Sequence, residues 1–174
     1  SSYDLIIGNL PYYITSGIIE YLLLNAKNAK RLVLMVQKEA YYRLIDKKEK
    51  SPLSLLLSYV GKTNVVCNVT RNAFAPVPHV DSLCFVVELN EFVKDNNNKL
   101  LYKLMCALFL YRRKNILNCL TNLLKDKLVA QEILSEANIL DNVRPEALSI
   151  NEYKNLLKIL NNKSIVFWGL FICI

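Results

Sequence analysis

The sequence predicts an α/β domain in its first half and a small all-helical domain in its second half. Short apolar runs alternate with helical spacing as far as Glu91, and only helical spacing follows. A polar stretch, 95–98 (DNNN), separates the two patterns. Hydrophobic residues make up 53% of the 174 residues and charged residues 21%, a composition that can form a buried core. We therefore expect domains at 1–91 and 92–163, followed by an apolar tail at 164–174.

Four segments of the first half have the apolar character of buried strands, namely 3–7, 32–36, 65–69 and 83–89. Helical stretches lie between them, at about 16–23, 39–45 and 52–59. Ser16 is a candidate N-cap of the first helix, and Pro52 suits the first turn of the third. Strands that alternate with helices favour a parallel sheet, and the last two strands fit an antiparallel pair.

The second half has apolar residues on one helical face from Leu100 to Leu108, and again from Ile116 to Leu124. Pro145 interrupts this spacing, and Ser149 is a candidate cap of a last helix that runs to Leu160. The apolar segment Ile165–Ile174 is too short to span a bilayer. We expect a buried last segment or an atypical end of the gene model, and no stable membrane association.

Charge, cysteine and glycine content restrict the function. The net charge of +7 favours an anionic partner such as nucleic acid or an acidic membrane surface. Five scattered cysteines without a C-x-x-C pair, together with one histidine, make a metal site improbable and fit a reducing compartment. Four glycines exclude a complete glycine-rich nucleotide fingerprint. Without a secretion signal at the N-terminus, we expect a cytoplasmic protein, organellar in a eukaryote, and a monomer.

A candidate site, Asn9-Leu10-Pro11-Tyr12, follows the first strand directly. Ligands of open α/β sheets bind at the carboxyl ends of the strands, where this tetrapeptide is expected. The Asn9 amide can pair with an exocyclic amine, Pro11 restrains the backbone, and Tyr12 offers a face on which a flipped base can stack. These properties suit methylation of an adenine N6. The alternative is a strand-ending turn with a packed tyrosine.

The sequence resembles the ribosomal RNA adenine N6,N6-dimethyltransferases in several segments that occur in the family's order. The matching segments are NLPYYIT (9–15), MVQKEAYYRL (35–44), FAPVPHVDS (74–82), FLYRRKNILNCL (109–120, helical in the family) and RPEALS (144–149). Each motif alone is weak, but together they are specific and extend to about residue 163.

The resemblance implies a Rossmann-like fold and dimethylation of adjacent adenines near the 3′ end of small-subunit rRNA, with S-adenosylmethionine as methyl donor. Asn9, Leu10, Pro11 and Tyr12 would form the catalytic loop. Within it, Asn9 and Pro11 would hold the target amine and border the methyl donor, and Tyr12 would stack on the adenine. Phe74 would close the pocket from the other side, unless it only packs its loop. The expected partner is small-subunit rRNA or a pre-ribosomal small subunit.

Basic stretches fit an RNA partner. Residues 27–50 contain eight positive and three negative side chains, and residues 112–127 contain five and one. We expect Arg112, Arg113 and Lys114 to bind RNA phosphates. For Lys47 and Lys48, an ordinary solvated loop is an equal alternative.

One departure from the family concerns the cofactor. The family's glycine-rich turn of G-x-G-x-G type is missing, and so are the acidic residues that hold the cofactor's ribose and adenine. We therefore expect a truncated chain or a C-terminal piece of a longer protein, with doubtful activity of its own. Two alternatives stay open: a non-catalytic remnant that binds rRNA or ribosomes, and a large-subunit rRNA adenine methylase of the antibiotic-resistance type.

Overall fold

Four strands form one sheet in the first part of the chain, in the order β1-β2-β4-β3. They are β1 (Leu5–Asn9), β2 (Arg31–Gln37), β3 (Gly61–Val69) and β4 (Ser82–Leu89). Strands β1 and β2 are parallel, whereas β4 runs antiparallel to both β2 and β3. The sheet confirms the predicted α/β class. Strand β3 begins four residues before the predicted position, at a glycine.

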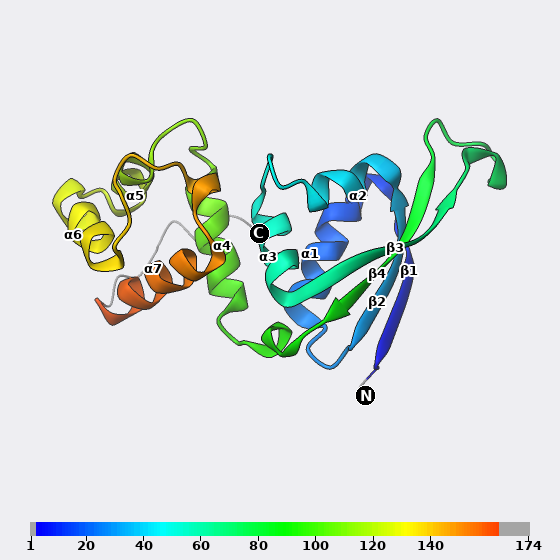
Figure 1. Cartoon of the computed structure of the whole chain (residues 1–174), viewed down its shortest axis with the longest axis horizontal. Helices are drawn as coiled ribbons and strands as arrows, with labels where there is room; N and C mark the ends of the chain where they lie inside the picture. Colours follow the sequence, from blue (N-terminus) through cyan, green and yellow to red (C-terminus); the bar gives the residue numbers. More distant parts are fainter. Residues whose placement is uncertain (1–2, 164–174) are drawn as a thin grey trace. The chain divides into compact units, whose positions relative to one another are not determined.

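Three helices cover one face of this sheet, as Figure 1 shows for the computed structural model. They are α1 (Thr15–Asn25), α2 (Lys38–Ile45) and α3 (Pro52–Val60). Alternate side chains of β2 and β4 are buried on this face: Leu32, Leu34, Val36, Leu83, Phe85 and Val87. This alternation is the pattern expected of strands packed on one side against helices.

The structure describes residues 3–163, and within residues 3–96 no helix covers the opposite face of the sheet. Edge strand β1 has Ile7 73% exposed and Leu5 44% exposed. An apolar edge strand of this kind is prone to association with another chain.

Local capping differs from the prediction at the first helix. Ser16 lies inside α1, after an N-cap at Ile14 that makes no side-chain hydrogen bond. Helix α3 follows the expected pattern, because Ser51 accepts a hydrogen bond from the N–H of Ser54 and Pro52 occupies the first turn.

The second part of the chain is helical, as predicted, and contains four α-helices among the described residues. They are α4 (Asn98–Phe109), α5 (Ile116–Leu124), α6 (Lys127–Ala137) and α7 (Ile150–Asn162). Ser149 caps α7 in a capping box with Glu152, as expected. Side chains from all four helices form the core, including Leu104, Leu108, Leu120, Ile133, Leu134, Tyr153 and Leu156.

Short 3-10 helices connect these elements: η1 (Tyr12–Ile14), η2 (Arg71–Ala73), η3 (Glu91–Lys94) and η4 (Pro145–Ala147). The chain divides into two units, 1–96 and 97–174. The sequence-based boundary was placed after residue 91. The expected apolar tail, 164–174, lies outside the described residues.

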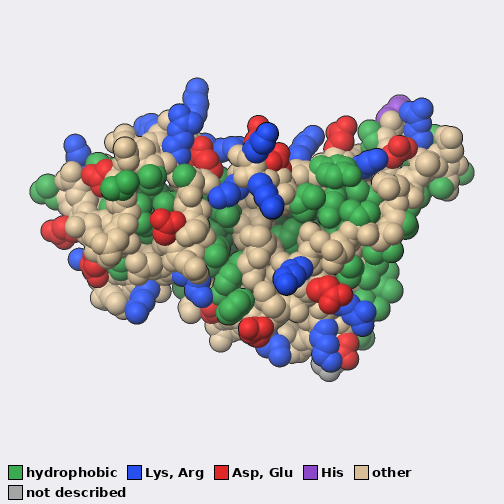
Figure 2. All heavy atoms as spheres, viewed as in Figure 1, with side chains coloured by type: hydrophobic (Ala, Val, Ile, Leu, Met, Phe, Trp, Pro, Cys, Tyr) green, Lys and Arg blue, Asp and Glu red, His purple; other side chains and the backbone are tan. Residues whose placement is uncertain are grey.

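Lys and Arg side chains are visible on both units in Figure 2. Among residues 3–163, no helix is long and apolar enough to cross a membrane.

Candidate active site

The Asn9–Tyr12 loop begins where β1 ends, at the carboxyl end of the parallel pair β1 and β2. Asn9 is the last residue of β1, pairs with Met35 of β2, and is exposed. The N–H of Leu10 donates a hydrogen bond to the carbonyl of Met35 over 3.0 Å, which extends the strand pairing by one residue. This places the exposed amide of Asn9 at the sheet edge where ligands of such folds bind.

Leu10 anchors the loop in the core. Its side chain is 6% exposed. A Cβ atom at Gly8 would lie only 3.1 Å from Leu10 Cδ2, so the missing side chain at Gly8 makes room for this packing. The buried Leu10 side chain therefore fixes the position of its neighbours in the loop.

The backbone of Pro11 closes the loop. Its carbonyl accepts hydrogen bonds from the N–H of Ile14 over 3.2 Å and from Thr15 Oγ1 over 2.9 Å. Both donors belong to the same short segment, and Thr15 is buried. The Pro11 carbonyl is therefore committed to this turn, whereas the Asn9 side chain is exposed at its start.

Tyr12 is tied to a distant segment. Tyr12 Oη and Ser82 Oγ are hydrogen-bonded at 2.8 Å, although 70 residues separate them in sequence. Ser82 is fully buried at the start of β4, while Tyr12 remains 36% exposed. The bond orients the Tyr12 ring by its hydroxyl end and leaves part of the ring accessible.

Residues 70–82 are held at the same end of the sheet by the Asp81 side chain and backbone. Asp81 Oδ1 accepts from the N–H of Arg71 over 2.9 Å, and the Asp81 carbonyl accepts from the N–H of Lys38 over 3.0 Å. Phe74 lies in this segment and is half-buried. The hydrogen bond that joins the segment to the loop is made by Ser82, eight residues after Phe74.

Tyr13 was missed by sequence reasoning and is the most accessible aromatic of the loop. Its exposed fraction is 87%, against 36% for Tyr12. The signal was present in the sequence, since only one of two adjacent tyrosines at a strand end can pack toward the core. The other one is then exposed. Tyr13 is therefore a second candidate for stacking on a nucleobase.

The basic triplet lies in the second unit, in the connection between α4 and α5. Arg112, Arg113 and Lys114 are all exposed and are not helical, which corrects the expectation of a helical element. Lys114 Nζ lies 5.6 Å from the centre of the Tyr111 ring. In an α-helix, consecutive side chains are rotated by about 100° around the axis, so three neighbouring cations point in different directions. The turn does not impose this rotation on Arg112, Arg113 and Lys114.

The loop itself carries no ionisable group before Tyr12. Asn9 can accept a hydrogen bond through its carbonyl oxygen and donate through its NH₂ group. Within residues 3–163, no cluster of three His, Cys, Asp or Glu side chains could hold a metal ion. The arrangement is therefore suited to orienting a neutral polar group beside an aromatic ring.

Comparisons with known proteins agree on one family. The model of the ribosomal RNA adenine dimethylase family matches residues 3–162. The ribosomal RNA small subunit methyltransferase A of Fusobacterium nucleatum is 35% identical over 166 residues, which are 91% of this chain and 62% of that protein. The protein of the same name from Clostridioides difficile is 36% identical over 164 residues, 91% of this chain and 57% of that protein. The chain thus spans about 60% of the length of these curated relatives.

Two solved structures of methyltransferases are similar in fold to this chain. A dimethyladenosine transferase from Plasmodium falciparum superposes with a TM-score of 0.81 at 26% identity, covering 97% of this chain and 70% of that one. The 23S rRNA methyltransferase ErmE superposes with a TM-score of 0.57 at 20% identity, covering 90% and 65%. The second match shows the shared fold alone.

Proposed function

The chain belongs to the ribosomal RNA adenine dimethylase family, and we propose that it forms the target-base side of an adenine N6-dimethyltransferase acting on small-subunit rRNA. The observation that carries the proposal is the Asn9–Tyr12 loop. Its exposed amide ends a parallel strand, and the adjoining tyrosine is oriented by a buried serine. The relatives named small subunit methyltransferase A support a small-subunit substrate.

In this proposal, Asn9 binds the exocyclic amine of an adenine that has left its stack, and Pro11 restrains the loop backbone beside it. The Asn9 carbonyl oxygen accepts from the amine, which orients the nitrogen lone pair for methyl transfer. No strong base is needed at this step, because the amine can release its proton to water after it has gained the methyl group. Leu10 and Thr15 hold the loop so that Asn9 keeps this position.

Tyr12 and Phe74 are proposed to hold the base itself. Tyr12 is fixed through Ser82 and presents part of its ring, so the adenine can stack without ordering a mobile side chain. Phe74 belongs to the segment that Ser82 and Asp81 anchor beside the loop. Its half-buried ring is proposed to limit the pocket on the other side.

S-adenosylmethionine is the cofactor that this family membership implies, and it supplies an electrophilic methyl group when bound. The residues present fit this cofactor only in part. Asn9 can border the methyl end, but the four glycines of the chain form no G-x-G-x-G turn for the nucleoside. We propose that other residues provide that part of the site.

The proposed partners are small-subunit rRNA and the particle that contains it, encountered in the cytoplasm or an organelle matrix. The net charge of +7 supports an RNA partner. Arg112, Arg113 and Lys114 are proposed to bind its phosphates, which would make 97–163 an RNA-facing helical unit.

The test is a methylation assay on small ribosomal subunits that lack the adenine modification. The natural gene product containing these residues is incubated with radiolabelled S-adenosylmethionine, and the rRNA is analysed by nuclease digestion and mass spectrometry. We expect N6,N6-dimethyladenosine, and we expect its loss in Asn9→Ala. The matched control is Asn28→Ala, which removes an exposed asparagine outside the loop. Equal activity of the two variants would exclude the role of Asn9.

A second candidate function is RNA binding without catalysis, and the missing glycine-rich turn favours it for the isolated chain. Calorimetric titration of the 174-residue chain with S-adenosylmethionine separates the two. We expect no saturable heat for the chain alone. Stoichiometric binding would show that these residues form a complete cofactor site by themselves or by self-association.

A further inference from the structure

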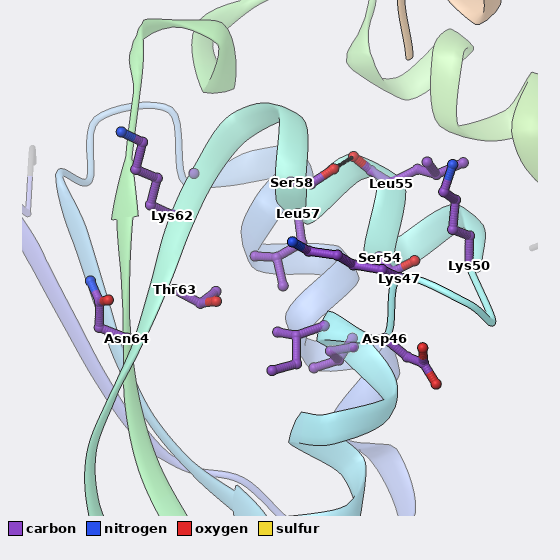
Figure 3. Close-up of a pocket in the computed structure, with 13 residues that line it drawn as sticks. Asp46, Lys47, Lys50, Ser54, Leu55, Leu57, Ser58, Lys62, Thr63 and Asn64 are labelled. Carbon is purple, nitrogen blue, oxygen red and sulfur yellow. Dashed lines mark hydrogen bonds between the residues drawn. The ribbon is translucent and has the colours of Figure 1, made fainter. Parts of the chain in front are cut away.

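A pocket of about 550 Å³ lies on the first unit (Figure 3), and none of its lining residues belongs to the Asn9–Tyr12 loop. It is bounded by the loop after α2, by helix α3 and by the first residues of β3. Buried leucines line its floor, among them Leu44, Leu55 and Leu57. The side chain of Thr63 on β3 forms part of its wall.

Strand order and register separate this pocket from the loop, because β3 and β1 are the two edge strands of the sheet. Asn9 pairs with Met35, which pairs with Cys84 of β4, whereas Gly61 at the pocket pairs with Leu89. Five residues separate Cys84 from Leu89, which is about 17 Å along a strand. The pocket therefore does not belong to the proposed active site.

Lysine side chains give the pocket its charge. Lys47, Lys50 and Lys62 line it, and none of them forms an ion pair within the described part of the chain. In Figure 3, the Lys47 side chain extends across the pocket from the α2–α3 loop toward β3. Lys47 and Lys50 have no acidic partner at the pocket, whereas the Lys62 side chain lies on the other face of β3, across from Glu88 of β4. An anion held at the pocket relieves the repulsion between the unpaired cations.

The single acidic residue in the lining does not neutralise them. Asp46 Oδ1 accepts hydrogen bonds from the N–H groups of Lys48 and Glu49, at 2.7 and 3.3 Å, so it stabilises the turn of its own loop. Its carboxylate points away from the pocket in Figure 3. The lining thus combines the cations Lys47 and Lys50 with an apolar floor.

We propose that this pocket is a second RNA-binding site, in which Lys47 and Lys50 bind a backbone phosphate and the leucine floor receives the adjoining nucleoside. The inference rests on the proposed function, because it takes the same RNA as ligand. A rim of cations over an apolar floor matches a nucleotide, which carries its charge at one end and a flat base at the other. The site would contact a part of the RNA other than the target adenine.

The test measures RNA binding and requires no methyl transfer. A fluorescein-labelled RNA stem-loop with two adjacent loop adenines is titrated with the full 174-residue chain, and anisotropy is followed at several salt concentrations. The variant Lys47→Gln/Lys50→Gln removes two pocket charges. The matched control, Lys48→Gln/Lys94→Gln, removes two charges at exposed lysines that do not line the pocket.

We expect the pocket variant to bind about tenfold more weakly and to reduce the salt slope by about one unit per lysine. The control is expected to change both quantities much less. Equal changes in the two variants, or no binding by the unmodified chain, would overturn the proposal.

A second variant separates the pocket from diffuse charge attraction. Ser58 lines the pocket and is exposed, and Ser58→Phe fills part of the hollow without altering the charge. We expect weaker RNA binding with an unchanged circular dichroism spectrum. Unaltered affinity in this variant would contradict a nucleoside on the leucine floor. These results are independent of methylation, so loss of the proposed enzymatic function would leave them interpretable.

Discussion

Tyr12 Oη and Ser82 Oγ lie 2.8 Å apart and join the loop that follows β1 to the first residue of β4. The two residues belong to different motifs, NLPYYIT and FAPVPHVDS, which resemble the same family. Their hydrogen bond gives a physical reason for the occurrence of both motifs in one chain. The serine is buried and fixed in the sheet, so it determines where the tyrosine ring lies.

Removal of the Tyr12 hydroxyl tests this relationship. Tyr12→Phe leaves the buried Ser82 hydroxyl without its partner and is expected to lower the free energy of unfolding by about 1–3 kcal/mol. Ser82→Ala in the same background removes the unsatisfied group, so the double variant should lose less than the sum of the single variants. Urea denaturation of the four proteins measures this coupling, and strict additivity would show that the bond contributes no stability.

The aromatic ring and the hydroxyl of Tyr12 are expected to have separate effects on methyl transfer. Tyr12→Phe keeps the stacking face and should retain most of the activity of the natural gene product, whereas Tyr12→Ala should lose most of it. Equal loss in the two variants would mean that the hydroxyl, and not the ring, is what the reaction requires.

Tyr13 provides a second test of base stacking. Its side chain is 87% exposed, so Tyr13→Ala should leave the unfolding free energy within about 0.5 kcal/mol of the unmodified value. If a nucleobase stacks on it, the same change weakens RNA binding by about 1–3 kcal/mol. Fluorescence anisotropy with a labelled stem-loop measures the affinity. Tyr21→Ala, an exposed tyrosine on α1, is the matched control and should bind RNA normally.

The basic turn between α4 and α5 should contribute to the salt dependence of RNA binding. Arg112→Ala/Arg113→Ala removes two exposed cations and is expected to reduce the slope of log K against log salt by about one unit per arginine. Lys99→Ala/Lys158→Ala removes the same charge from exposed positions on α4 and α7 and should reduce the slope less. An unchanged slope in the arginine variant would mean that these side chains face only solvent.

Sequence reasoning predicted the element order of the first unit and the position of the Asn9–Tyr12 loop, because both depend on local signals. An apolar run followed by Gly8 and Pro11 predicts a strand and its end without knowledge of the rest of the fold. The Tyr12–Ser82 bond could not be predicted in this way, since it joins residues 70 positions apart.

The helical half shows where local signals fail. Residues 109–116 contain neither glycine nor proline, so the only signals of the break that contains Arg112 are the polar run 112–115 and the capping residue Asn115. Likewise, α5 ends at Lys125, which adopts a left-handed φ of 60° where glycine is the usual signal. Neither break is marked by the glycine or proline that usually ends a helix.

The RPEALS segment, residues 144–149, is predicted to stabilise the second unit through Tyr153. The buried hydroxyl of Tyr153 donates a hydrogen bond to the Pro145 carbonyl over 2.8 Å. Burial, more than the nearby Cys119, Glu146 and Glu152, raises the pKa of Tyr153 well above its usual value, so it stays protonated as a donor. Tyr153→Phe should lower the unfolding free energy by about 0.5–1.5 kcal/mol in urea denaturation, because the Pro145 carbonyl keeps only its hydrogen bond from the N–H of Leu148. Tyr21→Phe is the exposed control, and an equal effect in both would contradict the prediction.

Cysteine reactivity should differ sharply between the two units. Burial raises the pKa of the Cys119 thiol to about 11, against a smaller lowering by Lys114, so only about one thiol in a thousand is ionised at pH 8. Cys67 is exposed on β3 and is accessible to reagent. We expect iodoacetamide at pH 8 to alkylate Cys67 long before Cys119, as read by peptide mass spectrometry at successive times.

Because the folded state holds the Cys119 proton more tightly than the unfolded state, the stability from this thiol is complete below pH 9.0 and is lost as the pH rises toward 11. Cys119 should therefore become reactive over that range, and rapid labelling of Cys119 at pH 8 would contradict its burial in the core formed with α5.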